Sequence, residues 1–156
     1  MAEAVREMSE IPAEQHLSFP LARLNAKLTA QANRLLRKHS DLSLSEWRVV
    51  VFLSSRGEGS LADFIRFSGL DKSQMSKITQ DLIRRGLVHT RQSEVDLRVQ
   101  ILSITPKGEL AYQQALPHMR SRREHLIAAL SLEEQAQYFS ILSKIEAASE
   151  AYEAEL

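Results

Sequence analysis

Two short helices in immediate succession are the feature that most limits what this chain can fold into. Ser60, a favoured N-cap residue, precedes the segment LADFIRFS, and Gly69 marks the end of that segment. Asp71 and Gln74 have the spacing of a capping box at the start of KSQMSKITQDLIRR, which is followed by Gly86. A short helix, a turn that contains glycine and a second helix predict a helix-turn-helix unit.

The periodicity of apolar residues changes after this unit. The segments LVHTRQ (87–92) and VQILSIT (99–105) are rich in β-branched residues, which favour strands. The segment between them, SEVDLR, is mostly polar and contains no proline. We therefore predict a two-stranded β-hairpin whose long tip carries Asp96, Leu97 and Arg98.

Helices are also predicted before this region. Apolar residues recur at three- and four-residue spacing over residues 17–36, which is typical of an amphipathic helix. Ser43 and Glu46 form a capping box that opens a second, largely buried helix, and Gly57 marks its end. The glycines of Gly57-Glu58-Gly59 favour a turn over a phosphate-binding loop, because no third glycine or lysine-serine pair follows.

Two further helices are predicted after the hairpin. Pro106 opens a long helix, since proline is favoured in the first helical turn, and Pro117 predicts a kink near residues 113–117. Ser131 and Glu134 form another capping box that opens a terminal helix. The whole pattern predicts a single, mainly α-helical (α+β) domain of about six helices and one β-hairpin.

Composition excludes several classes of protein. The chain has no cysteine, so it has no disulfides, thiol nucleophile or cysteine-ligated metal. Its five histidines have neither metal-binding nor catalytic spacing, which predicts no metal, no cofactor and no enzymatic activity; they are His16, His39, His89, His118 and His125. The longest apolar run, VVVFL, is too short to span a membrane, and residues 1–15 do not have the pattern of a secretory signal. We therefore expect a cytoplasmic protein without a membrane partner.

Charge is distributed unevenly although the net charge is zero. Residues 66–107 carry eight basic and four acidic side chains, whereas residues 131–156 carry one basic and six acidic side chains. A basic segment in the middle of the chain suits contact with phosphate groups.

The second helix of the helix-turn-helix unit has two chemically different faces. Met75, Ile78 and Leu82 cluster on one face at about 100° per residue. The opposite face and its flanks carry short hydroxyls, amides and basic groups, the side chains that contact base edges and phosphates in a major groove. A solvent-exposed helix would show the same pattern, but a following hairpin with basic residues favours a DNA-binding winged helix-turn-helix.

The sequence resembles the MarR-type transcriptional regulators over nearly its whole length. The motifs that carry the resemblance occur in the family order: LSLSEWRVVVFL, SLADFIRFSGLDKSQMSKITQDLIRRGLV, the wing RQSEVDLR, and ITPKG. The resemblance implies a homodimer that binds a pseudo-palindromic double-stranded DNA operator. It assigns residues 43–105 to a winged helix-turn-helix lobe and residues 15–40 and 106–156 to dimerisation helices.

The resemblance also implies roles for individual residues. It places Ser73, Gln74, Ser76, Lys77 and Gln80 in the major groove. Basic residues near these positions are expected to contact the DNA backbone, namely Lys72, Arg84 and Arg91. In the wing, Asp96 would orient Arg98, and Arg98 would enter the minor groove. Leu97 departs from the family pattern, in which a second arginine often occupies this position, and leaves one arginine at the tip.

A small-molecule effector is implied as well, with an aromatic acid or its coenzyme A thioester as the expected class. A carboxylate ligand needs a cation or hydroxyl beside an apolar surface. The candidates are His16, Ser18, Arg23, Trp47 and Arg48, for each of which a surface or packing role remains the alternative. The absence of cysteine excludes regulation by thiol oxidation.

Two other functions stay open on the sequence. A winged-helix module that serves protein assembly without binding DNA is the main alternative, although the basic middle and Arg98 count against it. A small enzyme would need a convergent cluster of titratable residues, and the sequence shows none. The sequence does not distinguish a repressor from an activator, and it identifies neither the effector nor the regulated genes.

Overall fold

The computed structural model describes residues 12 and 16–155. Most of the residues on which we based the expectation about a secretory signal, and the outermost residues of the two expected dimerisation segments, lie outside that range. The described residues form two compact units that divide after Pro117. Each unit is described by itself.

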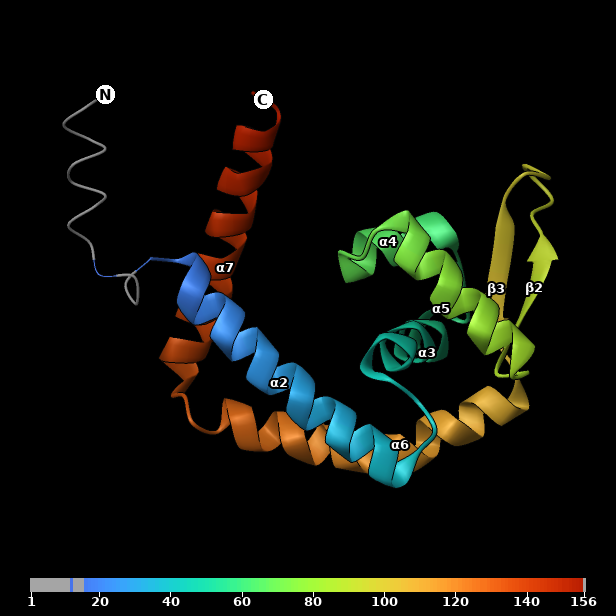
Figure 1. Ribbon diagram of the computed structural model, residues 1–156, viewed down its shortest axis with the longest axis horizontal. Coiled ribbons are helices and arrows are strands. Elements are labelled where there is room, and N and C mark those ends of the chain that lie inside the picture. The colour runs from blue at the N-terminus through green and yellow to red at the C-terminus, as the bar shows by residue number, and fades with distance from the viewer. Residues whose placement is uncertain (1–11, 13–15, 156) are drawn as a thin grey trace. The chain divides into compact units, whose positions relative to one another are not determined.

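Six helices and three strands make up the described residues. In chain order they are α2 (Ser18–His39), α3 (Leu44–Arg56), β1 (Glu58–Ser60), α4 (Leu61–Ser68), α5 (Lys72–Arg84), β2 (Val88–Gln92), β3 (Gln100–Ile104), α6 (Pro106–Ile127) and α7 (Leu132–Glu153) (Figure 1). The prediction of a mainly α-helical fold with about six helices and a β-hairpin is confirmed.

Most helices begin where the sequence predicts. Ser43, Ser60 and Ser131 each accept a hydrogen bond from the backbone three residues later, and the acidic side chain at that position bonds back to the serine amide. These are complete capping boxes, which satisfy two backbone donors each. At α5 the structure shows the Asp71 half of the predicted box, in which the Asp71 carboxylate accepts the Gln74 N–H at 2.8 Å.

The sheet has three strands, one more than predicted. Its order is β1-β3-β2, and both pairs are antiparallel. The prediction of a turn at residues 57–59 was therefore partly wrong, because Gly57 ends α3 but Glu58 and Gly59 pair with β3. Gly59 packs so closely against α3 that a Cβ atom there would lie 2.6 Å from the Phe52 ring. This close contact requires glycine. Because glycine is rare in strands, the sequence pattern predicted a turn here instead of a strand.

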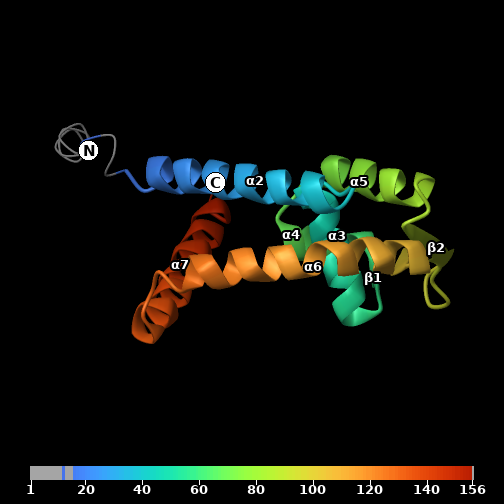
Figure 2. The same ribbon diagram turned by 90° about the horizontal axis from the view of Figure 1, so that it is seen from below.

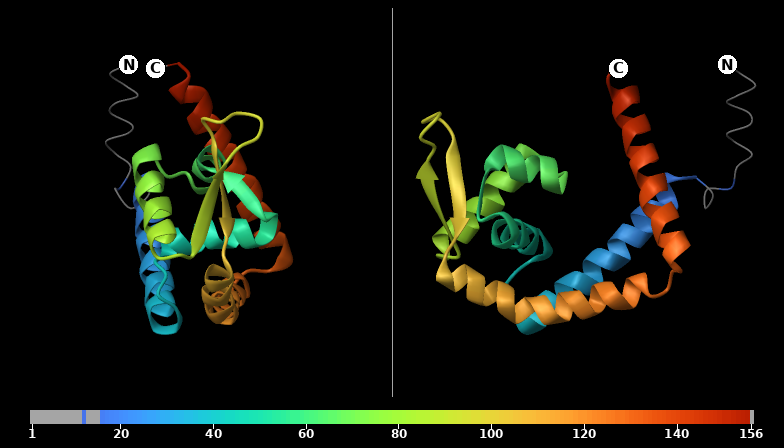
Figure 3. Two further views of the ribbon diagram at one scale, coloured as in Figure 1. Left: turned by 90° about the vertical axis from the view of Figure 1, so that its right-hand side faces the viewer. Right: turned by 180° about the vertical axis from the view of Figure 1, so that it is seen from behind.

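Most of the hydrophobic core of the first unit lies within the winged lobe, defined as residues 43–105. The Phe52 and Phe64 rings are 4.6 Å apart, centroid to centroid, and join α3 to α4. Met75 and Leu82 bury the inner face of α5 against them, and both side chains are fully inaccessible. Figure 1 shows the loop that joins β2 and β3 at the far end of the hairpin from the start of α6, and the same hairpin is seen from behind in Figure 3.

Helix α6 begins at the base of the hairpin (Figure 2). Pro106 occupies its first position, as predicted, and the helix continues through Pro117 without a break. In the second unit, α7 has no buried residue among those described. None of the helices that the structure describes is both long and apolar enough to cross a membrane.

Candidate nucleic-acid interface

Helix α5 presents the two faces that the sequence predicts. Met75 and Leu82 are buried, whereas the predicted reading positions Ser73, Gln74 and Lys77 are exposed. Thr79 was not expected in the core, yet its side chain is buried and its hydroxyl donates to the Met75 carbonyl at 3.0 Å. A buried threonine is tolerated here because its own helix satisfies the hydroxyl.

A cavity of about 520 Å³ lies between α4, α5 and β3. Lys72, Ser76 and Gln80 line it from α5, and Arg98 lines it from the wing. Four of the predicted DNA-binding residues, which come from segments distant in sequence, therefore meet on one side of the winged lobe. The ammonium and the guanidinium only donate hydrogen bonds, which suits phosphate groups. The hydroxyl and the amide both donate and accept, which suits base edges.

The tip of the wing is held in one conformation by its own polar groups. The Asp96 carboxylate accepts the Arg98 N–H at 2.9 Å, and the Asp96 carbonyl accepts the Val99 N–H at 2.9 Å. The Ser93 hydroxyl accepts the N–H groups of Val95 and Asp96 at 3.3 and 3.4 Å. Asp96 thus bonds to the backbone on both sides of the Arg98 peptide unit.

The outermost side chains of the tip are apolar. Val95 is 98% exposed and Leu97 is 70% exposed. Arg98, by contrast, contributes to the wall of the cavity beside α5. Leu97, the departure from the family pattern, is therefore exposed to solvent in the loop between β2 and β3.

Two of the predicted backbone contacts already have carboxylate partners in the protein. Arg84 pairs with Asp81 one turn earlier in α5. Arg91 on β2 reaches across β3 to Glu58 on β1, where both Glu58 oxygens accept from the same guanidinium nitrogen at 3.0 and 3.2 Å. Among the described residues no ion pair engages the remaining predicted cations, Lys72, Lys77 and Arg98. These three cations are the ones that a phosphate meets without competition.

Asp81 lies at the edge of this face and stays ionised. A side-chain hydrogen bond with Glu46, followed by the positive charges of Arg84 and Arg85, lowers the pKa of the Asp81 carboxyl. An ionised Asp81 keeps Arg84 paired at neutral pH.

The candidate ligand-binding residues do not come together within one chain. Trp47 is buried on α3 and stacks on Tyr112 of α6, with ring centroids 5.3 Å apart, and Arg48 follows it on the same helix. His16, Ser18 and Arg23 belong to the first turns of α2 or just precede it. The last turn of α2 leads into α3, and a 22-residue helix is about 30 Å long. His16, Ser18 and Arg23 thus lie at the start of α2, whereas Trp47 and Arg48 lie in the helix that follows its other end.

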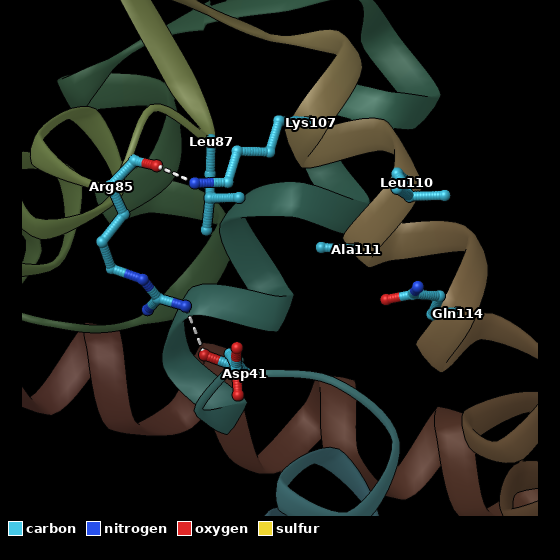
Figure 4. A pocket seen from close by; sticks show the side chains of 7 residues that line it. All are labelled: Asp41, Arg85, Leu87, Lys107, Leu110, Ala111 and Gln114. Atoms are coloured by element: carbon cyan, nitrogen blue, oxygen red, sulfur yellow. Dashed lines mark hydrogen bonds between the residues drawn. The ribbon is translucent and has the colours of Figure 1, made fainter.

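A smaller cavity of about 270 Å³ lies near the end of α5 (Figure 4). It is lined by a different set of residues, namely Asp41, Arg85, Leu87, Lys107, Leu110, Ala111 and Gln114. The charged groups of Arg85 and Lys107 in this lining donate hydrogen bonds within the protein. Within the part of the chain that the structure describes, no three acidic or histidine side chains are placed to hold a metal ion.

Comparison with known proteins shows a similarity to one family over part of the chain. The family model described as MarR family matches residues 40–98. Over these residues the chain is similar to the MarR family. The HTH-type transcriptional repressor IacR of Pseudomonas putida is 35% identical over 88 residues, which are 56% of this chain and 52% of IacR. The chain therefore spans about half the length of this MarR-type relative.

Solved structures show that the likeness in fold extends beyond the matched segment. BpsR of Bordetella bronchiseptica, whose DNA binding is regulated by 6-hydroxynicotinic acid, has a TM-score of 0.78 at 18% identity, over 87% of this chain and 96% of BpsR. MepR of S. aureus, solved as a complex with DNA, has a TM-score of 0.76 at 16% identity, over 85% of this chain and 97% of MepR. The winged helix-turn-helix fold and its long flanking helices are thus those of MarR-type proteins.

Proposed function

We propose that this protein is a transcriptional regulator that binds a pseudo-palindromic DNA operator as a homodimer and acts as a repressor. The observation that carries the proposal is the meeting of Lys72, Ser76, Gln80 and Arg98 at one cavity on the winged lobe. The IacR repressor and the MepR–DNA complex support it by similarity.

Each predicted contact has a distinct role in this proposal. The exposed or half-buried side chains of α5 read base edges in the major groove, and they are Ser73, Gln74, Ser76, Lys77 and Gln80. Lys72, Arg84 and Arg91 contact the DNA backbone, the last two after exchanging a carboxylate for a phosphate. Asp96 orients the wing, from which Arg98 enters the minor groove.

Exposed apolar side chains support a homodimer. Leu17, Leu21 and Leu24 of the N-terminal segment are exposed, and so are Phe139 and Ile141 of α7. Large apolar groups in such numbers mark a surface that becomes covered. A second copy of the chain provides the symmetric partner that a pseudo-palindromic operator requires.

An effector that weakens DNA binding completes the proposal. BpsR responds to 6-hydroxynicotinic acid, and we propose an aromatic acid or its coenzyme A thioester for this chain. Arg48 and the Trp47–Tyr112 stack offer a cation beside aromatic surface. A site that also used His16, Ser18 and Arg23 would need a second chain, because α2 separates them from Trp47 within one chain.

Selection of bound fragments from the source genome tests the function directly. A regulator enriches fragments with a pseudo-palindromic sequence, and their affinity falls steeply as salt rises. A protein-assembly module elutes as a dimer and enriches no sequence, which would overturn the proposal. Genes beside the enriched fragments then name acids to add as effectors.

Two substitutions sharpen this test. Arg98→Ala removes one phosphate-facing charge per subunit and should weaken binding to every fragment, with the slope of log affinity against log salt smaller by about 2 per dimer. Lys77→Ala should cost roughly 1 to 3 kcal/mol at particular base pairs only. Arg34→Ala, which removes an exposed arginine of α2 outside the winged lobe, is the matched control and should leave affinity and slope unchanged.

A further inference from the structure

The C-terminal end of α5 is attached to its surroundings by polar groups on two sides. Arg84 and Arg85 are neighbours at this end, but they have different environments. The Arg84 side chain is 80% exposed and pairs with Asp81 of its own helix. The Arg85 side chain is 30% exposed; it also lies 3.4 Å from Asp81, but its shorter ion pair, at 2.6 Å, is with Glu46 of α3.

The Arg85 guanidinium joins α5 to the connection between α2 and α3. Its Nη1 donates to Glu46 Oε1 at 2.6 Å, and its Nη2 donates to the Asp41 carbonyl at 2.5 Å. Glu46 is buried, and its other carboxylate oxygen accepts the Ser43 N–H at 2.6 Å to cap α3. One planar side chain therefore bridges the α2–α3 connection and the first turn of α3, a geometry that suits the fork of arginine donors.

The backbone at the same end of α5 is attached to α6. Lys107 Nζ donates to the Arg85 carbonyl at 2.8 Å, and Thr105 Oγ1 donates to the Gly86 carbonyl at 2.8 Å. Figure 4 shows the Lys107 side chain extending to that carbonyl, and the Arg85 side chain extending to Asp41. An ammonium at the end of α5 also complements the negative end of the helix dipole.

Gly108 makes the attachment to α6 tight. A Cβ atom at this position would lie 2.0 Å from the Leu87 carbonyl oxygen, so no other residue allows α6 to approach so closely. The Thr105 N–H donates to the same carbonyl at 3.1 Å. The end of α5 is thus attached to the α2–α3 connection by the Arg85 side chain, and to the start of α6 by bonds that the backbone carbonyls of residues 85–87 accept.

We propose that Arg85 is a positioning residue that sets the spacing between DNA half-sites which the protein accepts. This inference rests on the proposed function. In a homodimer the two α5 helices must enter major grooves about one helical turn apart. Residues 15–40 and 106–156, which contain α2 and α6, are the segments expected to form the dimer, so the attachment of α5 to the α2–α3 connection and to α6 fixes its position relative to the partner's α5. Arg84, one residue away, acts on DNA through a phosphate contact instead.

A panel of operators whose half-site spacing changes by single base pairs separates the two roles. The unmodified protein should show a sharp optimum of spacing. Arg85→Met keeps the length of the side chain but removes its donors, so affinity at the optimum should fall roughly tenfold while affinity at neighbouring spacings changes little. Arg84→Met is the matched control, because it should lower affinity by one factor at every spacing and reduce the salt slope.

Arg85→Lys separates charge from geometry. One ammonium retains the charge but lacks the fork that reaches both Glu46 and the Asp41 carbonyl. It should therefore flatten the spacing preference as Arg85→Met does. A folded Arg85→Met or Arg85→Lys protein with the original optimum and the original ratio between spacings would overturn the inference.

Hydrogen exchange on the DNA-free protein tests the attachment independently of the proposed function. Loss of the Arg85 bridge should speed amide exchange at residues 41–46 and 81–87 in Arg85→Lys, whereas Arg84→Met should leave these amides unchanged. Equal exchange in the two variants overturns the inference whether or not DNA is bound. If the unmodified protein selects no DNA, the proposed function fails, and the exchange result still decides whether Arg85 positions α5.

Discussion

The winged lobe and the terminal helix α7 contain similar apolar residues and use them differently. In the lobe, Phe64, Leu53 and Met75 are at most 1% exposed. In α7, Phe139 is 59% exposed and Ile141 is 55% exposed. Both regions contain a complete Ser-x-x-acid capping box, at Ser60 for α4 and at Ser131 for α7. Local helix signals are therefore alike, and the two regions differ in what covers their apolar side chains.

This difference indicates two sources of stability. The lobe buries its apolar surface within one chain, at roughly 25 cal/mol per Å² of apolar area. Helix α7 leaves comparable side chains accessible. They can add to stability only when a partner covers them, and the proposed homodimer provides that partner. Stability of the lobe should accordingly be independent of protein concentration, whereas association through α7 should depend on it.

Truncation of one phenylalanine in each region is expected to give the largest effect. Phe64→Ala removes a fully buried ring and should lower the free energy of unfolding of the lobe by roughly 3 to 5 kcal/mol. Phe139→Ala removes an exposed ring and should leave that value within about 0.5 kcal/mol in dilute solution, while it weakens dimerisation. Denaturant titration at several protein concentrations, followed by Trp47 fluorescence, measures both, with sedimentation for the dimer. Equal losses of unfolding free energy in the two variants would show that the lobe and α7 do not differ in how their apolar side chains contribute to stability.

A methyl group added at Gly108 should have the next largest effect. Its Cβ would meet the Leu87 carbonyl oxygen at 2.0 Å, and the backbone on one side must move. We expect Gly108→Ala to cost roughly 1 to 3 kcal/mol, although alanine favours helix more than glycine does. Ser140→Thr adds one methyl group at an exposed position of α7 and should cost less than about 0.5 kcal/mol. A more stable Gly108→Ala protein in thermal unfolding would show that α6 does not approach so closely.

Sequence patterns predicted those parts of the fold that depend on neighbouring residues. Capping serines, terminal glycines and the apolar stripe of α5 each depend on residues within one or two helical turns. The sequence therefore predicted the helix ends and the buried face of α5. The strand Glu58–Ser60 was not predicted, because three residues with a central glycine carry no strand signal of their own. Gly59 pairs with Leu102, a residue that the chain brings back only after two helices and a hairpin.

For the candidate interface, too, the sequence predicted what depends on neighbouring residues and missed what depends on contacts between distant segments. The exposure of Ser73 and Lys77 follows from helical periodicity. The partner of Arg91 is Glu58, 33 residues earlier, and the partner of Arg85 is Glu46, 39 residues earlier. Composition could not distinguish a basic residue that is available to phosphate from one that is already bridged by a carboxylate. Only the structure shows that Arg84 is exposed whereas Arg85 is partly buried and bonded to α3.

The two capping boxes give the smallest expected effect, through pH. Hydrogen bonds from the Ser60 side chain and backbone, followed by Arg66, lower the pKa of Asp63 from 3.8 to about 2. Because the folded state lowers this pKa, the stabilisation is fully present above about pH 4 and is lost as pH falls toward 2. The Asp63 side chain is 35% exposed, so screening by solvent leaves on the order of 1 kcal/mol.

Asp63→Asn should therefore lower the stability of the lobe by about 1 kcal/mol at pH 7 and by much less near pH 2. The backbone N–H and hydroxyl of Ser131 similarly lower the pKa of Glu134, but that carboxylate is exposed at the start of α7. Glu134→Gln removes the matching group and should leave the cooperative unfolding of the lobe unchanged at every pH, because Glu134 is exposed and α7 has no buried residue among those described. Denaturant titrations between pH 2 and pH 7 measure both variants. A parallel pH dependence in the two would mean that α7 and the lobe unfold as one unit, which contradicts the separation argued from their burial.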